Sequence, residues 1–138
     1  MKNLVVHMNF NDNCEEAFNF YKNAIGGEII AKQTYGDMPM PGMPVPDSQK
    51  SKILHIEYKF DDVLIMGADA MPDKTVTVGN NISISINIED ETEQAKIFGK
   101  LAEGGNVTMP LQDTFWNAKF GTLIDKYDVG WMLNCPKK

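Results

Sequence analysis

Hydrophobic and polar residues alternate in two segments that lie 78 residues apart. Residues 4–10 read LVVHMNF, with a hydrophobic residue at every second position, and residues 82–88 read ISISINI. A period of two is typical of a half-buried β-strand, because successive side chains point to opposite faces of the sheet. We therefore predict strands at Leu4–Phe10 and Ile82–Ile88. Further strands are predicted at Glu28–Thr34, Lys52–Phe60 and Val63–Gly67, near Val107, and at Ala118–Asp125 and Val129–Asn134.

Each alternating segment is followed by hydrophobic residues at helical spacing. The first predicted helix starts after the polar residues 11–13 (NDN), which we expect to cap it, and has two glutamates in its first turn, where the helix dipole favours acids. It ends at Gly26-Gly27, and a second helix is predicted at Glu91–Glu103. The stripe of the first helix consists of Ala17, Phe20, Tyr21, Ala24 and Ile25.

The two halves of the chain are copies of one unit. Residues 15–29 align without a gap with residues 93–107, and seven of the fifteen pairs are identical. A repeat of this length is a structural module, so both halves are predicted to have the order β-α-β-β-β. The predicted fold class is α+β, with module one at residues 1–72 and module two at residues 80–136 of a single domain, 1–138.

The first module carries an insertion. The last two strands of the halves align at an offset of 67, as in the pairs Ile53/Phe120 and Ile65/Met132, which leaves eleven extra residues in module one. The extra segment, Met38–Ser48, reads MPMPGMPVPDS, and its prolines disfavour helix and central strand. We expect an extended loop that acts either as a lid over a ligand cleft or as an arm packed on the body or on a partner subunit.

Composition excludes several classes of protein. A net charge of −6 and a pI near 4.8 disfavour a nucleic-acid partner, which usually requires a basic face. No run reaches about 18 apolar residues and no secretory segment is visible, so we expect a cytoplasmic protein without a membrane partner. Cys14 and Cys135 lack metal-type spacing and are expected to be reduced thiols. Cys14 lies at a helix start, where its pKa could be lowered, but a packing role is favoured.

Three segments resemble a known family: residues 10–21 (FNDNCEEAFNFY), residues 35–39 (YGDMP) and residues 105–135 (GNVTMPLQDTFWNAKFGTLIDKYDVGWMLNC). Together with the tandem modules, they resemble the PhnB-like branch of the vicinal oxygen chelate superfamily, which includes glyoxalase I, extradiol dioxygenases and bleomycin-binding proteins. The resemblance implies a glyoxalase-like fold, in which curved mixed sheets surround a cleft. PhnB-like proteins often carry the name 3-demethylubiquinone-9 3-methyltransferase, yet the chain has no glycine-rich loop of the kind that binds S-adenosylmethionine.

The resemblance also implies where metal ligands would lie. Metal enzymes of the superfamily use four ligands, two in each module, and the matching positions here are Val6, Ile65, Ile84 and Met132. These side chains offer no imidazole, carboxylate or thiolate, so we expect no metal and no other cofactor. His7 is one residue beyond the first position, and a one-residue step in a strand reverses the face unless the register slips.

Aromatic residues are the strongest candidates for ligand binding. The expected ligand-binding set is Phe10, Tyr35, Phe115, Trp116 and Phe120, whereas Trp131 is expected in the core.

Three functions stay open. The first is a metal-free small-molecule-binding protein, and the second is an enzyme that uses His7 or His55 at a metal site, or His55, Glu57 or Asp125 as a base. The third is a structural or partner-binding dimer. We expect a homodimer, because two open sheets leave unpaired edges.

Overall fold

A computed structural model describes residues 1–37, 41–42 and 44–138 of the chain. Part of the predicted Met38–Ser48 loop, residues 38–40 and 43, therefore lies outside the described residues. The chain divides into two compact units, Met1–Thr77 and Val78–Lys138, and each is described by itself. No helix in the described ranges is long and apolar enough to span a membrane.

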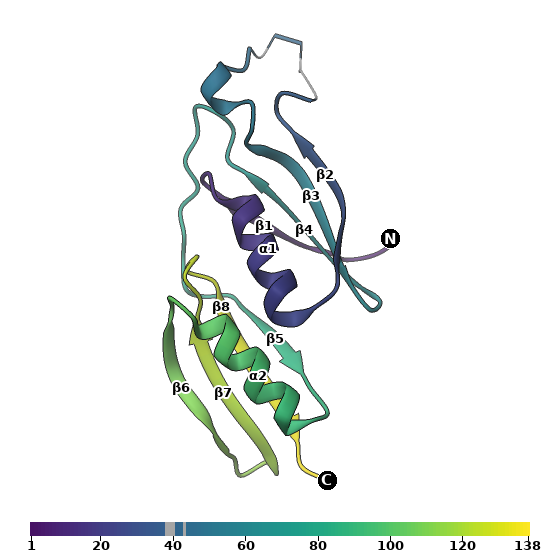
Figure 1. Ribbon diagram of the computed structural model, residues 1–138, viewed down its shortest axis with the longest axis vertical. Helices are drawn as coiled ribbons and strands as arrows, with labels where there is room; N and C mark the ends of the chain where they lie inside the picture. The colour runs from purple at the N-terminus through teal and green to yellow at the C-terminus, as the bar shows by residue number, and fades with distance from the viewer. Residues whose placement is uncertain (38–40, 43) are drawn as a thin grey trace. The chain divides into compact units, whose positions relative to one another are not determined.

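The first unit is a four-stranded sheet with one helix. Its elements are β1 (Val6–Phe10), α1 (Cys14–Ile25), β2 (Glu28–Thr34), a 3-10 turn η1 (Asp47–Gln49), β3 (Ile53–Phe60) and β4 (Val63–Asp69). The strand order is β1-β4-β3-β2, in which β1 and β4 are parallel and the other pairs are antiparallel (Figure 1).

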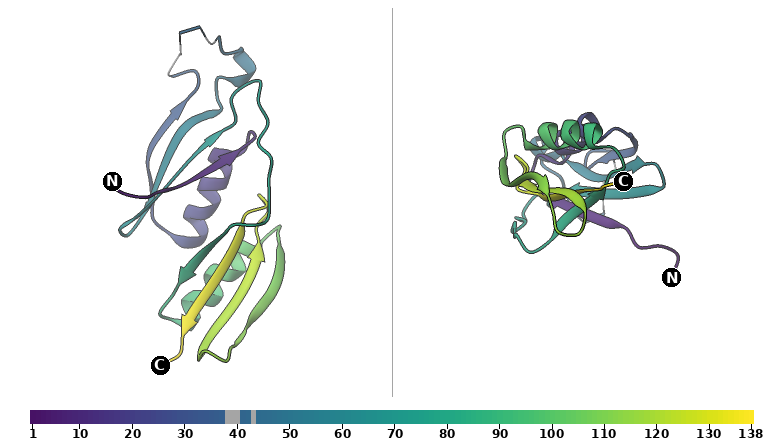
Figure 2. Two further views of the ribbon diagram at one scale, coloured as in Figure 1. Left: turned by 180° about the vertical axis from the view of Figure 1, so that it is seen from behind. Right: turned by 90° about the horizontal axis from the view of Figure 1, so that it is seen from below.

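The second unit repeats this arrangement. Its elements are β5 (Ser83–Asn87), α2 (Glu91–Ala102), β6 (Asn106–Asp113), β7 (Ala118–Ile124) and β8 (Gly130–Pro136), with the strand order β5-β8-β7-β6. Seen from behind, each helix lies on one face of its own sheet (Figure 2). The predicted tandem β-α-β-β-β modules are therefore confirmed.

The core of the first unit forms around Phe18 of α1, which is fully buried. Its ring makes edge-to-face contacts with Phe10 of β1 and Tyr58 of β3, at centroid distances of 6.1 and 6.2 Å. Gly67 of β4 lies beneath the same ring, because a Cβ there would come within 2.6 Å of Phe18 Cε2. These three strands therefore direct Phe10, Tyr58 and Gly67 toward the helix.

A buried carboxylate connects the helix to the sheet. Asp69 of β4 accepts hydrogen bonds from the backbone N–H of Cys14 at 3.0 Å and of Ile53 at 2.8 Å. The expected capping by residues 11–13 is wrong in this respect, since Asn13 makes no side-chain cap hydrogen bond. The acceptor is the Asp69 carboxylate of β4 instead. It holds the start of α1 next to the start of β3 and the end of β4.

A second buried carboxylate closes the turn between β7 and β8. Asp125 accepts hydrogen bonds from the backbone N–H of Tyr127 and Val129 and from the indole N–H of Trp131, the last at 2.8 Å. Trp131 is 2% exposed, which confirms its predicted place in the core. Asp125 is also 2% exposed, so its oxygens are engaged in structure and are not placed to act as a base on a substrate.

The strand pairings correct the internal alignment of the last strands. Val6 pairs with Ile65 in the first unit, and its repeat equivalent Ile84 pairs with Trp131 in the second. Ile65 therefore corresponds to Trp131 at an offset of 66, not to Met132 at 67. Tyr58, opposite Ile65, likewise corresponds to Leu123, opposite Trp131, at an offset of 65, so one gap-free offset fits neither of the last two strands.

The close approach at Gly67 yields a stability prediction. We expect Gly67→Ala to lower the free energy of unfolding by about 1–3 kcal/mol, because the added methyl would clash with the Phe18 ring and with Met8 O at 2.9 Å. Gly99→Ala is the matched control, since a Cβ at this position of α2 meets no atom within 4 Å and the change should be neutral or stabilising. Urea unfolding of both variants checks this, and equal stabilities would contradict the packing described.

Candidate functional site

The face of each sheet that is turned away from its own helix is the candidate site, and we call it the open face. In the first unit, Ile56 and Tyr58 of β3 are buried against the helix side, so the residues that alternate with them point the other way. His55 and Glu57 therefore lie on the open face. The pairings place Met66 of β4 and His7 of β1 in the same row as Glu57.

The open face of the second unit is defined in the same way. Trp131 and Leu133 of β8 are buried beneath α2, and Gln94 of that helix donates a hydrogen bond to Leu133 O at 3.2 Å. Met132 and Asn134 alternate with these residues and lie on the open face. The pairings put Ser85 of β5 beside Met132.

The four positions matched to the family's metal ligands are divided between the two faces of the sheets. Ile65 pairs with Val6 on one side and with the helix-facing Tyr58 on the other, and Ile84 pairs with the helix-facing Trp131. Val6, Ile65 and Ile84 therefore lie on the helix side of their sheets. Of the four positions, only Met132 lies on an open face. His7 faces the open side with no register slip. The open-face residues that correspond in the two units are His7 and Ser85 on the first strands and Met66 and Met132 on the last.

The open face of the first unit carries ionisable side chains. Nε2 of His55 lies 3.5 Å from Oε2 of Glu57. The pKa of His7 lies below its ordinary value, because desolvation and the neighbouring charge of His55 both disfavour its protonated form. The neutral form of His7 is therefore favoured, beside the His55–Glu57 pair. Among the described residues, no three His, Cys, Asp or Glu side chains are grouped so that they could hold a metal ion.

The open face of the second unit is neutral at the equivalent positions. Thr122, opposite Met132, takes the place of Glu57, opposite Met66, and Phe120 precedes Thr122 by two residues as His55 precedes Glu57. The hydroxyl of Thr122 is hydrogen bonded to that of Thr108 on β6 at 2.6 Å. The duplication has thus produced one ionisable open face and one neutral open face.

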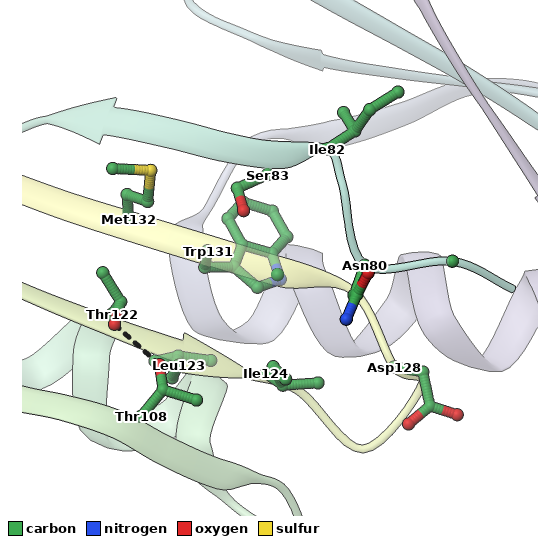
Figure 3. Close-up of a pocket in the computed structure, with 12 residues that line it drawn as sticks. Asn80, Ile82, Ser83, Thr108, Thr122, Leu123, Ile124, Asp128, Trp131 and Met132 are labelled. Carbon is green, nitrogen blue, oxygen red and sulfur yellow. Dashed lines mark hydrogen bonds between the residues drawn. The ribbon is translucent and has the colours of Figure 1, made fainter.

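A pocket of about 250 Å³ opens on the neutral face of the second unit (Figure 3). Gly130 forms part of its floor, because a Cβ at Gly130 would lie 2.9 Å from the hydroxyl of Ser83. The equivalent residue of the first unit is Leu64, whose side chain would fill such a space. The pocket is lined by Gly79, Asn80, Ile82, Ser83, Thr108, Thr122, Leu123, Ile124, Asp128, Gly130, Trp131 and Met132.

Three of the predicted ligand-binding aromatics form a cluster at the other end of this face. Trp116 packs edge-to-face against Phe120 with centroids 5.4 Å apart and against Phe115 at 4.9 Å. Its indole N–H donates to Oδ1 of Asn134 at 3.1 Å. Trp116 is 47% exposed and Phe115 is 97% exposed, so ring surface is available to solvent. We call Phe115, Trp116 and Phe120 the aromatic corner.

The other two predicted aromatics lie in the core of the first unit. Phe10 packs on Phe18 and is 5% exposed. Tyr35 is 3% exposed and donates to Asp69 O at 3.0 Å. Burial and the nearby Asp69 carboxylate raise the pKa of Tyr35. Both rings are therefore packed inside the first unit, with little surface exposed.

The reactive alternative for Cys14 is contradicted by its surroundings. Its side chain is fully buried, and desolvation raises the pKa of the thiol, with Asp69 and Glu15 adding to the effect. The packing role expected for this residue therefore holds. Cys135 is also a buried free thiol whose pKa is raised by desolvation.

Sequence reasoning missed Gly130, Asn87 and Asn134, which all contribute to the open face of the second unit. Asn134 donates through Nδ2 to Oδ1 of Asn87 at 3.3 Å. A signal was present in the alternating segment ISISINI, because its polar residues fall on one face of the strand. Following that polar face across the sheet leads from Asn87 to Asn134.

Comparison with known proteins gives close relatives over the whole chain. The family described as 3-demethylubiquinone-9 3-methyltransferase matches residues 2–134. The crystal structure of protein PA1353 from Pseudomonas aeruginosa is 37% identical, with a TM-score of 0.89 and 100% of both chains covered. Protein YjdN of Escherichia coli K12 is 30% identical, with 96% of this chain and 94% of that protein covered. A Bacillus cereus structure described as a putative 3-demethylubiquinone-9 3-methyltransferase, PhnB protein, is 29% identical, with a TM-score of 0.80 and coverage of 97% and 99%.

More distant structures share the fold. One, described as a glyoxalase/bleomycin resistance protein/dioxygenase from Nocardioides, has a TM-score of 0.58 at 15% identity, with 100% of this chain and 86% of that chain covered. At that identity the likeness concerns the path of the backbone, and the chemistry of the site must come from the residues present in each protein.

Proposed function

The chain belongs to the 3-demethylubiquinone-9 3-methyltransferase family, in the PhnB-like branch of the vicinal oxygen chelate superfamily, and we propose that it is a small-molecule-binding protein that needs no metal ion to bind its ligand. The proposed site is the open face of the second unit. The observation that carries the proposal is the pocket over Gly130, which lies on a sheet face whose central positions are neutral.

The side chains of this face suit a ligand with apolar and polar parts. Ile124 and Met132 supply apolar surface, and the Thr108–Thr122 pair and Ser83 supply hydroxyl groups. Pockets for small molecules usually combine mostly apolar walls with a few placed polar groups. The thioether of Met132 adapts to varied shapes, which favours binding of a bulky ligand over positioning of a reactive group.

The name of the family describes methyl transfer, which is not the activity that we propose. Each unit is a mixed four-stranded sheet with a single helix on one face, not part of a doubly wound parallel sheet that presents a glycine-rich loop to a nucleotide. The proposal is therefore ligand binding and not methyl transfer.

An enzymatic function is the second candidate, and the ionisable open face of the first unit favours it. His55 and Glu57 form a pair of the kind that transfers protons, and His7 offers a neutral imidazole nearby. The test is elemental analysis of protein purified without chelators. The binding proposal expects less than a tenth of an equivalent of Zn, Mn, Ni or Fe, whereas a stoichiometric metal that His7→Ala removes would establish the metal-enzyme alternative.

A side chain introduced at Gly130, in the floor of the pocket, should weaken ligand binding. We expect Gly130→Leu to weaken binding of the fluorescent probe 8-anilinonaphthalene-1-sulfonate to the folded protein at least fivefold, because the leucine would occupy the space that Leu64 fills in the first unit. Ser83→Leu fills the pocket from the neighbouring strand and should act in the same way. Fluorescence titration measures both, with Gly99→Ala as the control. Unchanged affinity in two folded variants would rule out this pocket.

We also propose that the protein is a homodimer. The strands β2 and β6 are outer strands of their sheets, and they carry the exposed large apolar residues Ile30, Val107 and Met109. An outer strand with exposed apolar side chains is a template for pairing with a second chain. Sedimentation-velocity ultracentrifugation at micromolar concentration should give the mass of two chains of 15.5 kDa each. A monomer at all concentrations in this range would refute the proposal.

A further inference from the structure

The open face of the second unit holds a chain of three hydrogen-bonding side chains with a fixed polarity. The indole N–H of Trp116 can only donate, and it donates to Oδ1 of Asn134. This contact fixes the orientation of the Asn134 amide, so that its NH₂ group is directed toward β5. There it donates to Oδ1 of Asn87.

The direction of these hydrogen bonds leaves N–H donors on Asn87, the last residue of the series. Because this contact turns Oδ1 of Asn87 toward Asn134, the Nδ2 amide of Asn87, with two N–H donors, is turned the other way. No oxygen atom in the described part of the chain accepts from this nitrogen. Asn87 is exposed, so a ligand can reach these donors.

The donors lie on the same face as ring surface. Asn87, Asn134 and Phe120 occupy one row across β5, β8 and β7. Trp116 packs on Phe120 at the end of that row and remains half exposed. A planar ring in contact with Trp116 can therefore place a substituent beside the Asn134 and Asn87 amides.

The first unit lacks this arrangement, although its backbone is the same. Asn9 is the repeat equivalent of Asn87, but it pairs with Ala68 where Asn87 pairs with Asn134. Because Ala68 has no side-chain amide, Asn9 cannot accept a hydrogen bond of the kind that orients Asn87. The donor chain is thus a particular property of the second open face.

We propose that the aromatic corner, Asn134 and Asn87 form a subsite for a planar aromatic group that carries a hydrogen-bond acceptor oxygen, as in a carboxylate, amide or ketone. The proposal rests on the proposed binding function and specifies the ligand class for one end of the face. Stacking on Trp116 supplies contact area, and the fixed amide polarity selects acceptors over donors.

Three probes with one ring system test this selection. We expect 2-naphthoate and 2-naphthamide to bind at least fivefold more tightly than 2-naphthylmethylammonium, which has donors only. The titrations follow the side-chain amide signals of Asn87 and the indole N–H signal of Trp116 in ¹H–¹⁵N spectra. The chain has two tryptophans, so Trp116→Phe assigns the indole signal.

Substitutions in this series of hydrogen-bonded residues should change the preference for acceptor probes in different ways. Asn87→Ala should weaken 2-naphthamide about five- to tenfold, the size of one lost hydrogen bond, whereas Asn9→Ala should leave its affinity unchanged. Asn87→Asp replaces the donors with acceptors and should reverse the preference toward 2-naphthylmethylammonium. Trp116→Phe keeps a ring but removes the donor that orients Asn134, so it should reduce the preference for acceptors.

The outcomes separate this inference from the proposed function. Binding of 8-anilinonaphthalene-1-sulfonate that depends on Gly130, together with equal affinities for the three naphthyl probes, would overturn the acceptor-selective subsite and leave the binding proposal intact. Selective binding of 2-naphthamide with no effect of Gly130→Leu would support the subsite and count against the Gly130 pocket. If no naphthyl probe shifts the Asn87 or Trp116 signals at millimolar concentration, the subsite is refuted.

Discussion

The register of one parallel strand pair in each unit decides which side chains reach the open face. In the first unit this register is held by Asp69, whose carboxylate accepts backbone N–H groups from the start of α1 and the start of β3. Its own backbone oxygen accepts from Tyr35. Because the side-chain period of a strand is two residues, a slip by one position would exchange His7 for Val6 on the open face. The chemistry of the face therefore depends on a buried carboxylate that does not itself reach it.

The two units show how one backbone supports different surfaces. Equivalent rows hold His7, Met66 and Glu57 in the first unit and Ser85, Met132 and Thr122 in the second. The helix-facing positions must fill a core in both units, as Tyr58 does in the first and Leu123 and Trp131 do in the second. The open-face positions are free of that constraint, so duplication has allowed one face to become ionisable and the other neutral and aromatic.

The sequence was sufficient to predict the elements and their order, because the alternating strands, the helix stripes and the Gly-Gly helix end all occur twice. It was not sufficient to predict which face a residue occupies. A gap-free alignment used one offset of 67 for the last two strands, whereas the pairings give 65 for β3 and β7 and 66 for β4 and β8, and a shift of one residue reverses the face. Phe10 and Tyr35 read as candidate ring surface because sequence alone does not distinguish a core aromatic from an exposed one. The carboxylate that caps α1 is 55 residues distant, beyond any local capping pattern.

The two tryptophans occupy opposite environments, and this gives the protein two independent optical reporters. The indole of Trp131 is buried and hydrogen bonded to Asp125, so its emission follows the integrity of the second unit. The indole of Trp116 is half exposed beside Asn134, so its emission follows the occupancy of the open face. Two single-tryptophan variants, each keeping one of the two indoles, would thus report the folding of this unit and events on its surface separately.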